Sequence, residues 1–180
     1  MELNNKYEDL PTCWKDYCPK NFSKIYLGRI SLIDSFKSSS NIVPLKIAND
    51  ISLKKIINLA NLFGLGHNQK FEEFLPLAIG AYGDNLLNIT NAYNVLNSNG
   101  NLYKPSVLEK IESNNHELIW ENKFIPQKIL ETKVNKSLNN LLEKSVKEGT
   151  SIAASIEGEK VYGKTGTSDG NRDLWFIGSI

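Results

Sequence analysis

The residues best suited to chemistry form the run Gly163-Lys164-Thr165-Gly166-Thr167. In an extended strand, alternate side chains share one face, so the hydroxyls of Thr165 and Thr167 point the same way and both could bind one carboxylate. Gly166 has no side chain, which lets another backbone approach this strand closely. The spacing therefore indicates a strand that meets an anionic group beside a lysine.

A hairpin is expected to position this strand. Asp169-Gly170 is a strong turn signal between two arms rich in aromatic and β-branched residues. Asp173 is interpreted as a structural residue that pins the turn. Trp175 and Phe176 are predicted core residues, whereas the outer edge of their strand is expected to lack a partner strand and to promote aggregation.

The run resembles the third active-site motif of penicillin-binding proteins, the serine acyltransferases that cross-link peptidoglycan. That family carries the motifs S-x-x-K, S-x-N and K-T-G in this order. Ser39-Ser40-Asn41 fits the second motif, and 125 residues separate Ser39 from Lys164, an interval similar to that of the bifunctional, class A branch. Shorter matches lie at residues 14–22, 75–81, 91–100 and 149–154, so the resemblance runs nearly end to end.

The first motif, which would hold the nucleophilic serine and its lysine, is not found before Ser39. The resemblance places it roughly sixty residues upstream of S-x-N, and only 38 residues precede Ser39. Ser52-Leu53-Lys54-Lys55 has the spacing but follows the second motif, and we interpret Ser52 as a helix N-cap. Residues 1–180 are therefore expected to be an incomplete transpeptidase domain, truncated at both ends, without its nucleophile.

The resemblance implies roles for the matching residues. Among the catalytic residues, Ser39 would relay protons to the leaving nitrogen, Asn41 would bind the peptide carbonyl of the substrate, and Lys164 would hold positive potential beside them. The substrate-binding residues would be Thr165, Gly166 and Thr167. The two hydroxyls would bind the substrate carboxylate, and the last threonine's backbone N–H would form half of an oxyanion hole. The acyl donor would add to this strand as a further edge strand.

Each motif also has a non-catalytic interpretation, because Ser39 and Asn41 are residue types that favour helix ends and Lys164 alone would be a solvated strand lysine. Two hypotheses remain. The first is a D,D-transpeptidase fragment from a split or decaying gene, inactive alone, so that enzyme status is uncertain. The second is a non-enzymatic partner subunit or peptide-binding remnant that pairs with a separately encoded upstream half. A serine β-lactamase is a weaker alternative, because that branch has a shorter interval between the motifs.

Composition limits the partners and the location. The formal net charge of +1 argues against a nucleic-acid surface. The resemblance implies stem peptide and β-lactams as ligands, and no cofactor or metal is expected. Family members are anchored to the cytoplasmic membrane with the domain outside it, but the sequence shows no signal or membrane-spanning segment, so the chain as written is expected to be cytoplasmic. Cys13 and Cys18 are expected to be free thiols.

The order of elements predicts an α+β fold, a partial transpeptidase fold of the penicillin-binding protein and serine β-lactamase type with part of an antiparallel sheet. Residues 1–30 are expected to be loop. Helices are predicted at 31–38, after 41, and at 52–63, 86–96 and 134–148. Strands are predicted at 102–113 and 117–125 and on both sides of Asp169-Gly170.

Overall fold

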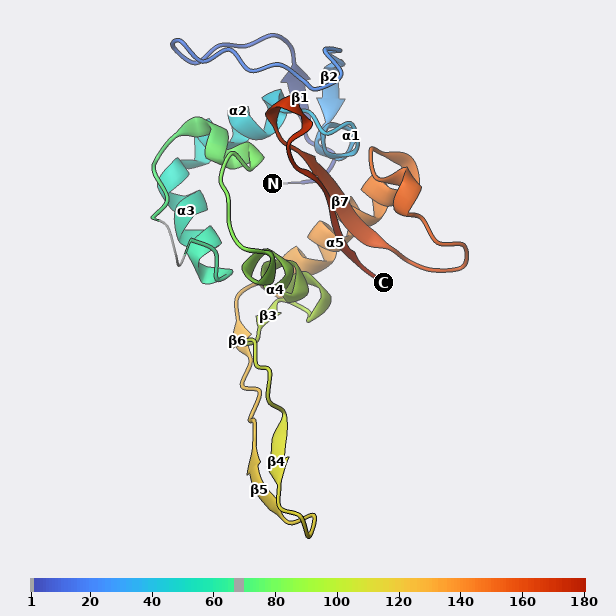
Figure 1. The fold of residues 1–180 in the computed structure, drawn as a ribbon. Helices are drawn as coiled ribbons and strands as arrows, with labels where there is room; N and C mark the ends of the chain where they lie inside the picture. Colours follow the sequence, from blue (N-terminus) through green and yellow to red (C-terminus); the bar gives the residue numbers. More distant parts are fainter. Residues whose placement is uncertain (1, 67–69) are drawn as a thin grey trace.

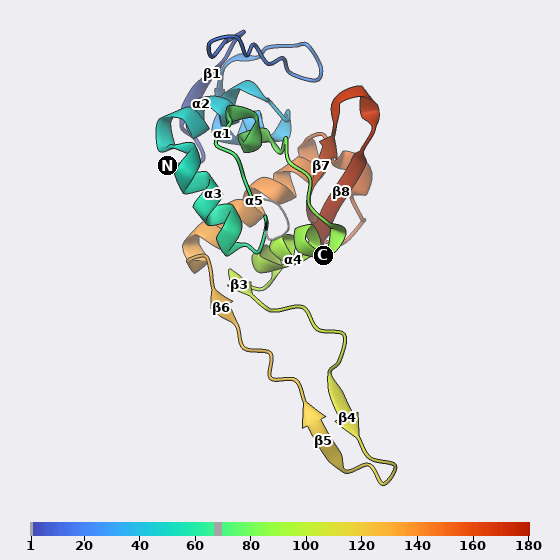
Figure 2. The same cartoon turned by 60° about the vertical axis from the view of Figure 1, so that its left-hand side comes forward.

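The computed structural model describes residues 2–66 and 70–180. Helices and two-stranded antiparallel ribbons form a body, and one narrow ribbon projects from it (Figures 1 and 2). This mixture confirms the predicted α+β class. Across the described ranges, every helix is too short or too polar to cross a lipid bilayer.

The first part of the chain is more ordered than the predicted loop. Strand β1 (Lys6–Asp9) pairs antiparallel with β2 (Gly28–Ser31), with Lys6 opposite Ser31. The expectation of loop was wrong because both strands are short and a long excursion separates them, so neither shows a periodic pattern. The expectation that Cys13 and Cys18 are free thiols was also wrong, since they form a disulfide with each other within this excursion.

The first helices follow the predicted signals closely. Helix α1 (Leu32–Lys37) begins after Ser31, whose Oγ accepts a bond of 3.0 Å from the Asp34 backbone N–H. Helix α2 (Ile42–Ile51) carries buried aliphatic side chains, and α3 (Leu53–Leu62) follows it. Ser52 occupies the predicted N-cap position of α3, but its side chain makes no capping hydrogen bond.

Helix α5 packs against both the first helix and the strand that carries Lys164. Helix α4 (Leu86–Asn97) and α5 (Thr132–Glu148) match their predicted positions, and α5 contacts α1, α4 and β7 (Tyr162–Thr167). Burial of one aliphatic side chain contributes about 1.5–3 kcal/mol to stability, so these contacts hold the helices together. The buried valine, leucine and isoleucine residues of α2, α4 and α5 are Ile42, Val43, Leu45, Val95, Leu141, Leu142 and Val146.

The strand that carries Lys164 forms the predicted hairpin. β7 pairs antiparallel with β8 (Leu174–Ser179), and Lys164 lies opposite Ile177. Asp173 pins the turn as expected, because its carboxylate accepts a bond of 2.9 Å from the Ser168 hydroxyl. Trp175 and Phe176 are 53% and 39% exposed, so their assignment to the core was wrong. β7 covers one edge of β8 and α4 contacts it, which leaves much of the strand open to solvent.

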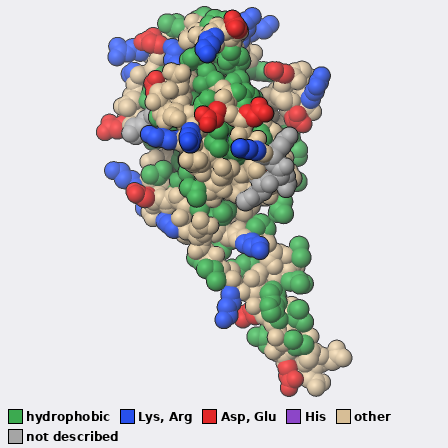
Figure 3. Space-filling view, turned by 90° about the vertical axis from the view of Figure 1, so that its left-hand side faces the viewer, with side chains coloured by type: hydrophobic (Ala, Val, Ile, Leu, Met, Phe, Trp, Pro, Cys, Tyr) green, Lys and Arg blue, Asp and Glu red, His purple; other side chains and the backbone are tan. Residues whose placement is uncertain are grey.

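The projecting ribbon departs from the two long strands predicted at 102–113 and 117–125. It contains two short pairs: β3 (Asn101–Leu102) with β6 (Gln127–Lys128), and β4 (Lys110–Glu112) with β5 (Leu118–Glu121). Pro105 and Pro126 lie between the pairs, where the missing N–H prevents continuous pairing. Hydrophobic side chains gather along this ribbon in the space-filling view (Figure 3).

Candidate active site at the Ser39–Lys164 junction

Ser39 lies where the chain reverses after α1. The backbone N–H of Ser39 donates to Phe36 O at 3.2 Å, and that of Ser40 donates to Ser35 O at 3.0 Å, which closes the end of the helix. Ser39 has φ 55°, in the left-handed region that glycine adopts without cost. For another residue this conformation costs about 1–2 kcal/mol. The S-x-N turn therefore holds Ser39 in a conformation that the surrounding contacts must stabilise.

A buried carboxylate fixes the residues next to Ser39. Asp9 is fully buried and accepts hydrogen bonds from Ser40 Oγ at 2.8 Å, from the Leu27 N–H at 2.9 Å and from Asn21 Nδ2 at 3.1 Å. Asn21 Oδ1 in turn accepts a bond of 2.9 Å from the Asn41 N–H. These contacts hold Ser40 and Asn41, the two residues that follow Ser39 in the S-x-N turn.

This network could not be predicted from the sequence. Asp9 lies in a segment expected to be loop, and a single aspartate in a loop has no distinguishing spacing. Pairing of β1 with β2 brings Asp9 beneath the turn, because Asp9 is the last residue of β1 and lies opposite Gly28. Only the three-dimensional pairing reveals its role.

Lys164 reaches Ser39 from strand β7, and both residues line one cavity. Its Nζ donates to Ser39 Oγ at 2.8 Å, to Thr165 O at 3.2 Å and to Thr150 Oγ1 at 3.3 Å. Within residues 2–66 and 70–180, no ion pair joins Lys164 to a carboxylate. Burial lowers the pKa of the Lys164 ammonium, because the charged form loses hydration. An incoming anion would relieve this cost.

The turn after α5 joins the two walls of the site. The Thr150 N–H donates to Lys37 O at 3.1 Å, and Thr150 Oγ1 lies 3.2 Å from Thr165 Oγ1. A side chain at Gly149 would collide with the Lys37 backbone, its Cβ lying 2.7 Å from Lys37 O. The absence of a side chain at Gly149 therefore permits this close approach. In the sequence, Thr150 belongs only to a short family match at residues 149–154, which does not predict its contact with Lys164.

Asn41 is half-buried, and its side chain is partly engaged. Its Nδ2 donates to Lys20 O at 2.8 Å, which ties the S-x-N turn to the excursion between β1 and β2. An amide nitrogen carries two N–H groups, so the second remains available to a ligand carbonyl.

The residues meet at a cavity of about 600 Å³. Ser39, Asn41, Lys164 and Thr165 line its polar side. Most of the remaining wall is apolar and comes from α1, α2, α3 and the 3₁₀ helix Leu75–Ile79, through Phe36, Ile47, Ile51, Ile56 and Ile79, among others. The structure thus brings four of the six predicted site residues to one cavity.

Gly166 and Thr167 lie farther along β7, at a neighbouring hollow. This hollow measures about 580 Å³ and is also lined by Tyr82 and Trp175. Thr165 and Thr167 pair with Phe176 and Leu174 of β8, so they occupy alternate positions on one face of the strand as predicted. The predicted site therefore extends along β7 across two adjoining spaces.

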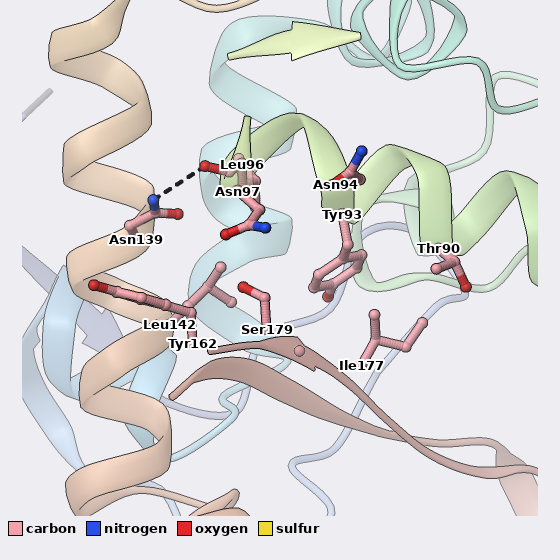
Figure 4. A pocket seen from close by; sticks show the side chains of 11 residues that line it. Thr90, Tyr93, Asn94, Leu96, Asn97, Asn139, Leu142, Tyr162, Ile177 and Ser179 are labelled. Atoms are coloured by element: carbon pink, nitrogen blue, oxygen red, sulfur yellow. Dashed lines mark hydrogen bonds between the residues drawn. The ribbon is translucent and has the colours of Figure 1, made fainter. Parts of the chain in front are cut away.

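A smaller cavity of about 110 Å³ lies between α4, α5 and the β7–β8 ribbon (Figure 4). Asn139 of α5 donates from Nδ2 to Leu96 O at 3.1 Å and closes one end of it. Its wall contains none of the six predicted site residues. It adjoins the cavity at the junction of Ser39 and Lys164, because Tyr93 lines both.

Comparisons of the sequence and of the structure with known proteins point to the same family. Residues 2–179 match the penicillin binding protein transpeptidase domain. Penicillin-binding protein 1A of Rickettsia prowazekii is 27% identical over 90% of this chain, and the chain spans 23% of that relative's length. The crystal structure of penicillin-binding protein 1A from Haemophilus influenzae superposes with a TM-score of 0.88 at 22% identity, covering 99% of this chain and 33% of that one. The D,D-transpeptidase domain from Eggerthella lenta gives a TM-score of 0.83 at 20% identity, covering 99% and 52%.

Proposed function

Because this chain belongs to the penicillin-binding protein transpeptidase domain family, we propose that its S-x-N turn and its K-T-G strand form two walls of a D,D-transpeptidase cleft. The cleft would acylate and cross-link cell-wall stem peptides through a serine acyl-enzyme. The observation that carries the proposal is the contact of 2.8 Å between Lys164 Nζ and Ser39 Oγ, across 125 residues of chain.

Acyl transfer needs a proton route to the departing nitrogen. A serine oxygen bonds to the carbonyl carbon of the penultimate residue and gives its hydroxyl proton to the lysine of the S-x-x-K segment. The peptide C–N bond then breaks, and the leaving amine takes up a proton through Ser39, which that lysine resupplies. Ser39 Oγ accepts its hydrogen bond from the Lys164 ammonium, so its own hydroxyl proton is free to be passed to that nitrogen. Asn41 would hold the substrate's peptide carbonyl through its second N–H.

The positive charge of Lys164 supports recognition of a carboxylate. The ammonium is partly desolvated and has no ion-pair partner in the described part of the chain. The hydroxyls of Thr165 and Thr167 would donate to the substrate carboxylate, and the Thr167 N–H would stabilise the oxyanion. The stem peptide or a β-lactam would lie along Thr165, Gly166 and Thr167.

The nucleophile is proposed to come from a segment other than these 180 residues. Ser52 has a lysine three residues later, but its side chain is exposed and does not line the cavity that holds Ser39 and Lys164. We therefore regard residues 1–180 as an incomplete transpeptidase domain, inactive unless an S-x-x-K segment is present.

A fluorescent penicillin tests this directly. The 180-residue chain alone should form no covalent adduct. Addition of a segment that carries the family's S-x-x-K motif should produce labelling that Lys164→Ala abolishes and that Lys160→Ala, at an exposed position before β7, leaves intact. Labelling of the chain alone that disappears in Ser52→Ala would contradict the assignment of the nucleophile, and labelling indifferent to Lys164→Ala would contradict the site.

The apolar wall of the cavity favours a second candidate, a non-enzymatic partner subunit. A separately encoded upstream segment would bury this wall, and the gain must exceed the association entropy, on the order of 4–15 kcal/mol. Isothermal titration with that segment separates the candidates. Binding without acylation supports the partner subunit, whereas binding with Lys164-dependent acylation supports the transpeptidase.

A further inference from the structure

The projecting ribbon has no function in the proposed cleft and exposes an unusual amount of apolar surface (Figure 3). Every residue of β4 and β5 is exposed, and within the part of the chain that the structure describes these strands make extensive contacts only with each other. The large hydrophobic side chains that are more than two-fifths exposed along the ribbon are Val107, Leu108, Ile111, Leu118, Ile119, Trp120, Phe124 and Ile125. A long exposed ribbon of this kind presents two strand edges that can pair with another chain.

The two edges of the ribbon differ. Ile111 pairs with Trp120 and the next residue, Glu112, pairs with Leu118, so Ile119 is an extra residue in β5. Such a bulge interrupts the regular alternation of N–H and C=O groups along the strand that contains it. β4 has no bulge. Its outer edge is therefore the more regular template for a further strand.

The hydrogen bonds to β5 determine which backbone groups of β4 point outward. Glu109 O accepts from the Asn122 N–H at 2.7 Å, and the Ser113 N–H donates to Glu117 O at 2.9 Å, so both residues turn their backbone toward β5. In an antiparallel pair this orientation alternates along the strand. Lys110 and Glu112 therefore direct their N–H and C=O groups away from β5, toward the free edge.

The side chains of β4 are complementary to a second copy of the same strand. In the twofold antiparallel register centred on Ile111, Lys110 lies opposite Glu112 of the other copy, and this pair occurs twice. Registers centred on Lys110 or on Glu112 place like charges opposite each other, which is unfavourable. Charge thus selects one register, and it is one in which the outward backbone groups of Lys110 and Glu112 can exchange hydrogen bonds.

We propose that β4 pairs with β4 of a second copy of this chain, in the register centred on Ile111, to form a four-stranded antiparallel sheet. Ile111 and Trp120 share one face of each ribbon, so the sheet would carry an uninterrupted apolar stripe of two isoleucines between two tryptophans. The two bodies lie at opposite ends of the sheet. Strands of three residues bury much less than about 1,200 Å², so the dimer is a weak one.

Sedimentation equilibrium of the 180-residue chain tests the proposal. The wild-type chain should show a monomer–dimer equilibrium. Glu112→Lys places like charges opposite each other twice in a homodimer, and its dissociation constant should rise roughly tenfold. Lys110→Glu should weaken its own homodimer similarly. A wild-type chain that stays monomeric over the whole soluble range would overturn the proposal.

Mixing the two variants provides a matched control. In a heterodimer of Lys110→Glu with Glu112→Lys, both cross-strand pairs are again of opposite sign, so the mixture should recover the affinity of the wild type. Lys110→Glu also faces Glu121 of its own hairpin, and recovery on mixing shows that the hairpin is still folded. If both variants associate as strongly as the wild type, self-association occurs elsewhere, for example at the apolar edge of β8, and the proposal is wrong.

Discussion

The junction of Ser39 and Lys164 and the projecting β4–β5 ribbon are built in opposite ways. At the junction, side chains distant in the sequence fix one another, as Asp9 fixes Ser40 and Lys164 reaches Ser39. At the tip of the ribbon, β4 and β5 follow each other in the chain and pair with each other, and every residue of these two strands is exposed. At the junction, contacts with distant residues fix the orientation of each side chain. In the ribbon, pairing between neighbouring strands leaves the side chains exposed and able to contact a partner.

The two regions should also differ in how strongly a substitution changes the free energy of unfolding. A buried carboxylate that accepts hydrogen bonds from three groups cannot be replaced by an apolar side chain without leaving those donors unsatisfied. An exposed side chain of the ribbon can be exchanged for another of similar β-propensity at little cost to folding. Paired substitutions of the same residue type therefore measure the contrast directly.

The largest effect is expected at Asp9. Asp9→Ala removes the acceptor for Ser40, Asn21 and the Leu27 N–H and should lower the free energy of unfolding by about 3 kcal/mol. Asp16→Ala, at an exposed position of the same segment, should change it by less than about 0.5 kcal/mol. Urea denaturation of both variants gives the comparison, and equal losses would show that the buried network contributes nothing specific.

A smaller effect is expected from a pair of valines. Val95 of α4 is fully buried, and Val95→Ala should cost about 2 kcal/mol because two methyl groups leave the core. Val107 of the ribbon is fully exposed, and Val107→Ala should leave stability within about 0.5 kcal/mol of the wild type. Thermal unfolding measures both, and a Val107→Ala loss as large as that of Val95→Ala would mean that the ribbon packs against the body.

The smallest effect concerns an ion pair between α1 and α5. Lys37 Nζ lies 2.7 Å from Glu148 Oε2, and this hydrogen bond is the main cause that lowers the pKa of Glu148 from its ordinary value of 4.5. A lowered carboxyl pKa stabilises the fold above pH 4.5, and that stabilisation is lost as the pH falls through the folded-state pKa. Glu148→Gln should therefore flatten the acid side of the stability profile.

The effect at Glu148 should be modest, because the pair is solvent-exposed and salt screens it. Urea denaturation between pH 3 and 7, at about 0.05 M and about 1 M salt, measures both dependences. Parallel pH profiles of wild type and Glu148→Gln at low salt would show that the pair does not contribute.

Most helices could be predicted because their signals are local. Ser31 with Asp34 marked the start of α1, and Gly149 marked the end of α5, since capping depends on residues three or four positions apart. The strands β1 and β2 could not be predicted, because their partners are far apart in the chain. Burial at β8 was also misjudged, since the apolar character of Trp175 and Phe176 does not reveal which element covers them.

Residue types and spacing alone were enough to recognise the two motifs, Ser39-Ser40-Asn41 and Lys164 to Thr167, with their order and their interval. The family resemblance also implies that Lys164 lies near Ser39. The packing of the helices and strands was needed to show the direct contact of 2.8 Å between them, the position of Asp9 beneath the turn, and the contact of Thr150 with both walls. The physical reason is that spacing along a chain encodes local hydrogen bonding and periodicity. Contacts between distant residues depend on how the helices and strands pack around a common core.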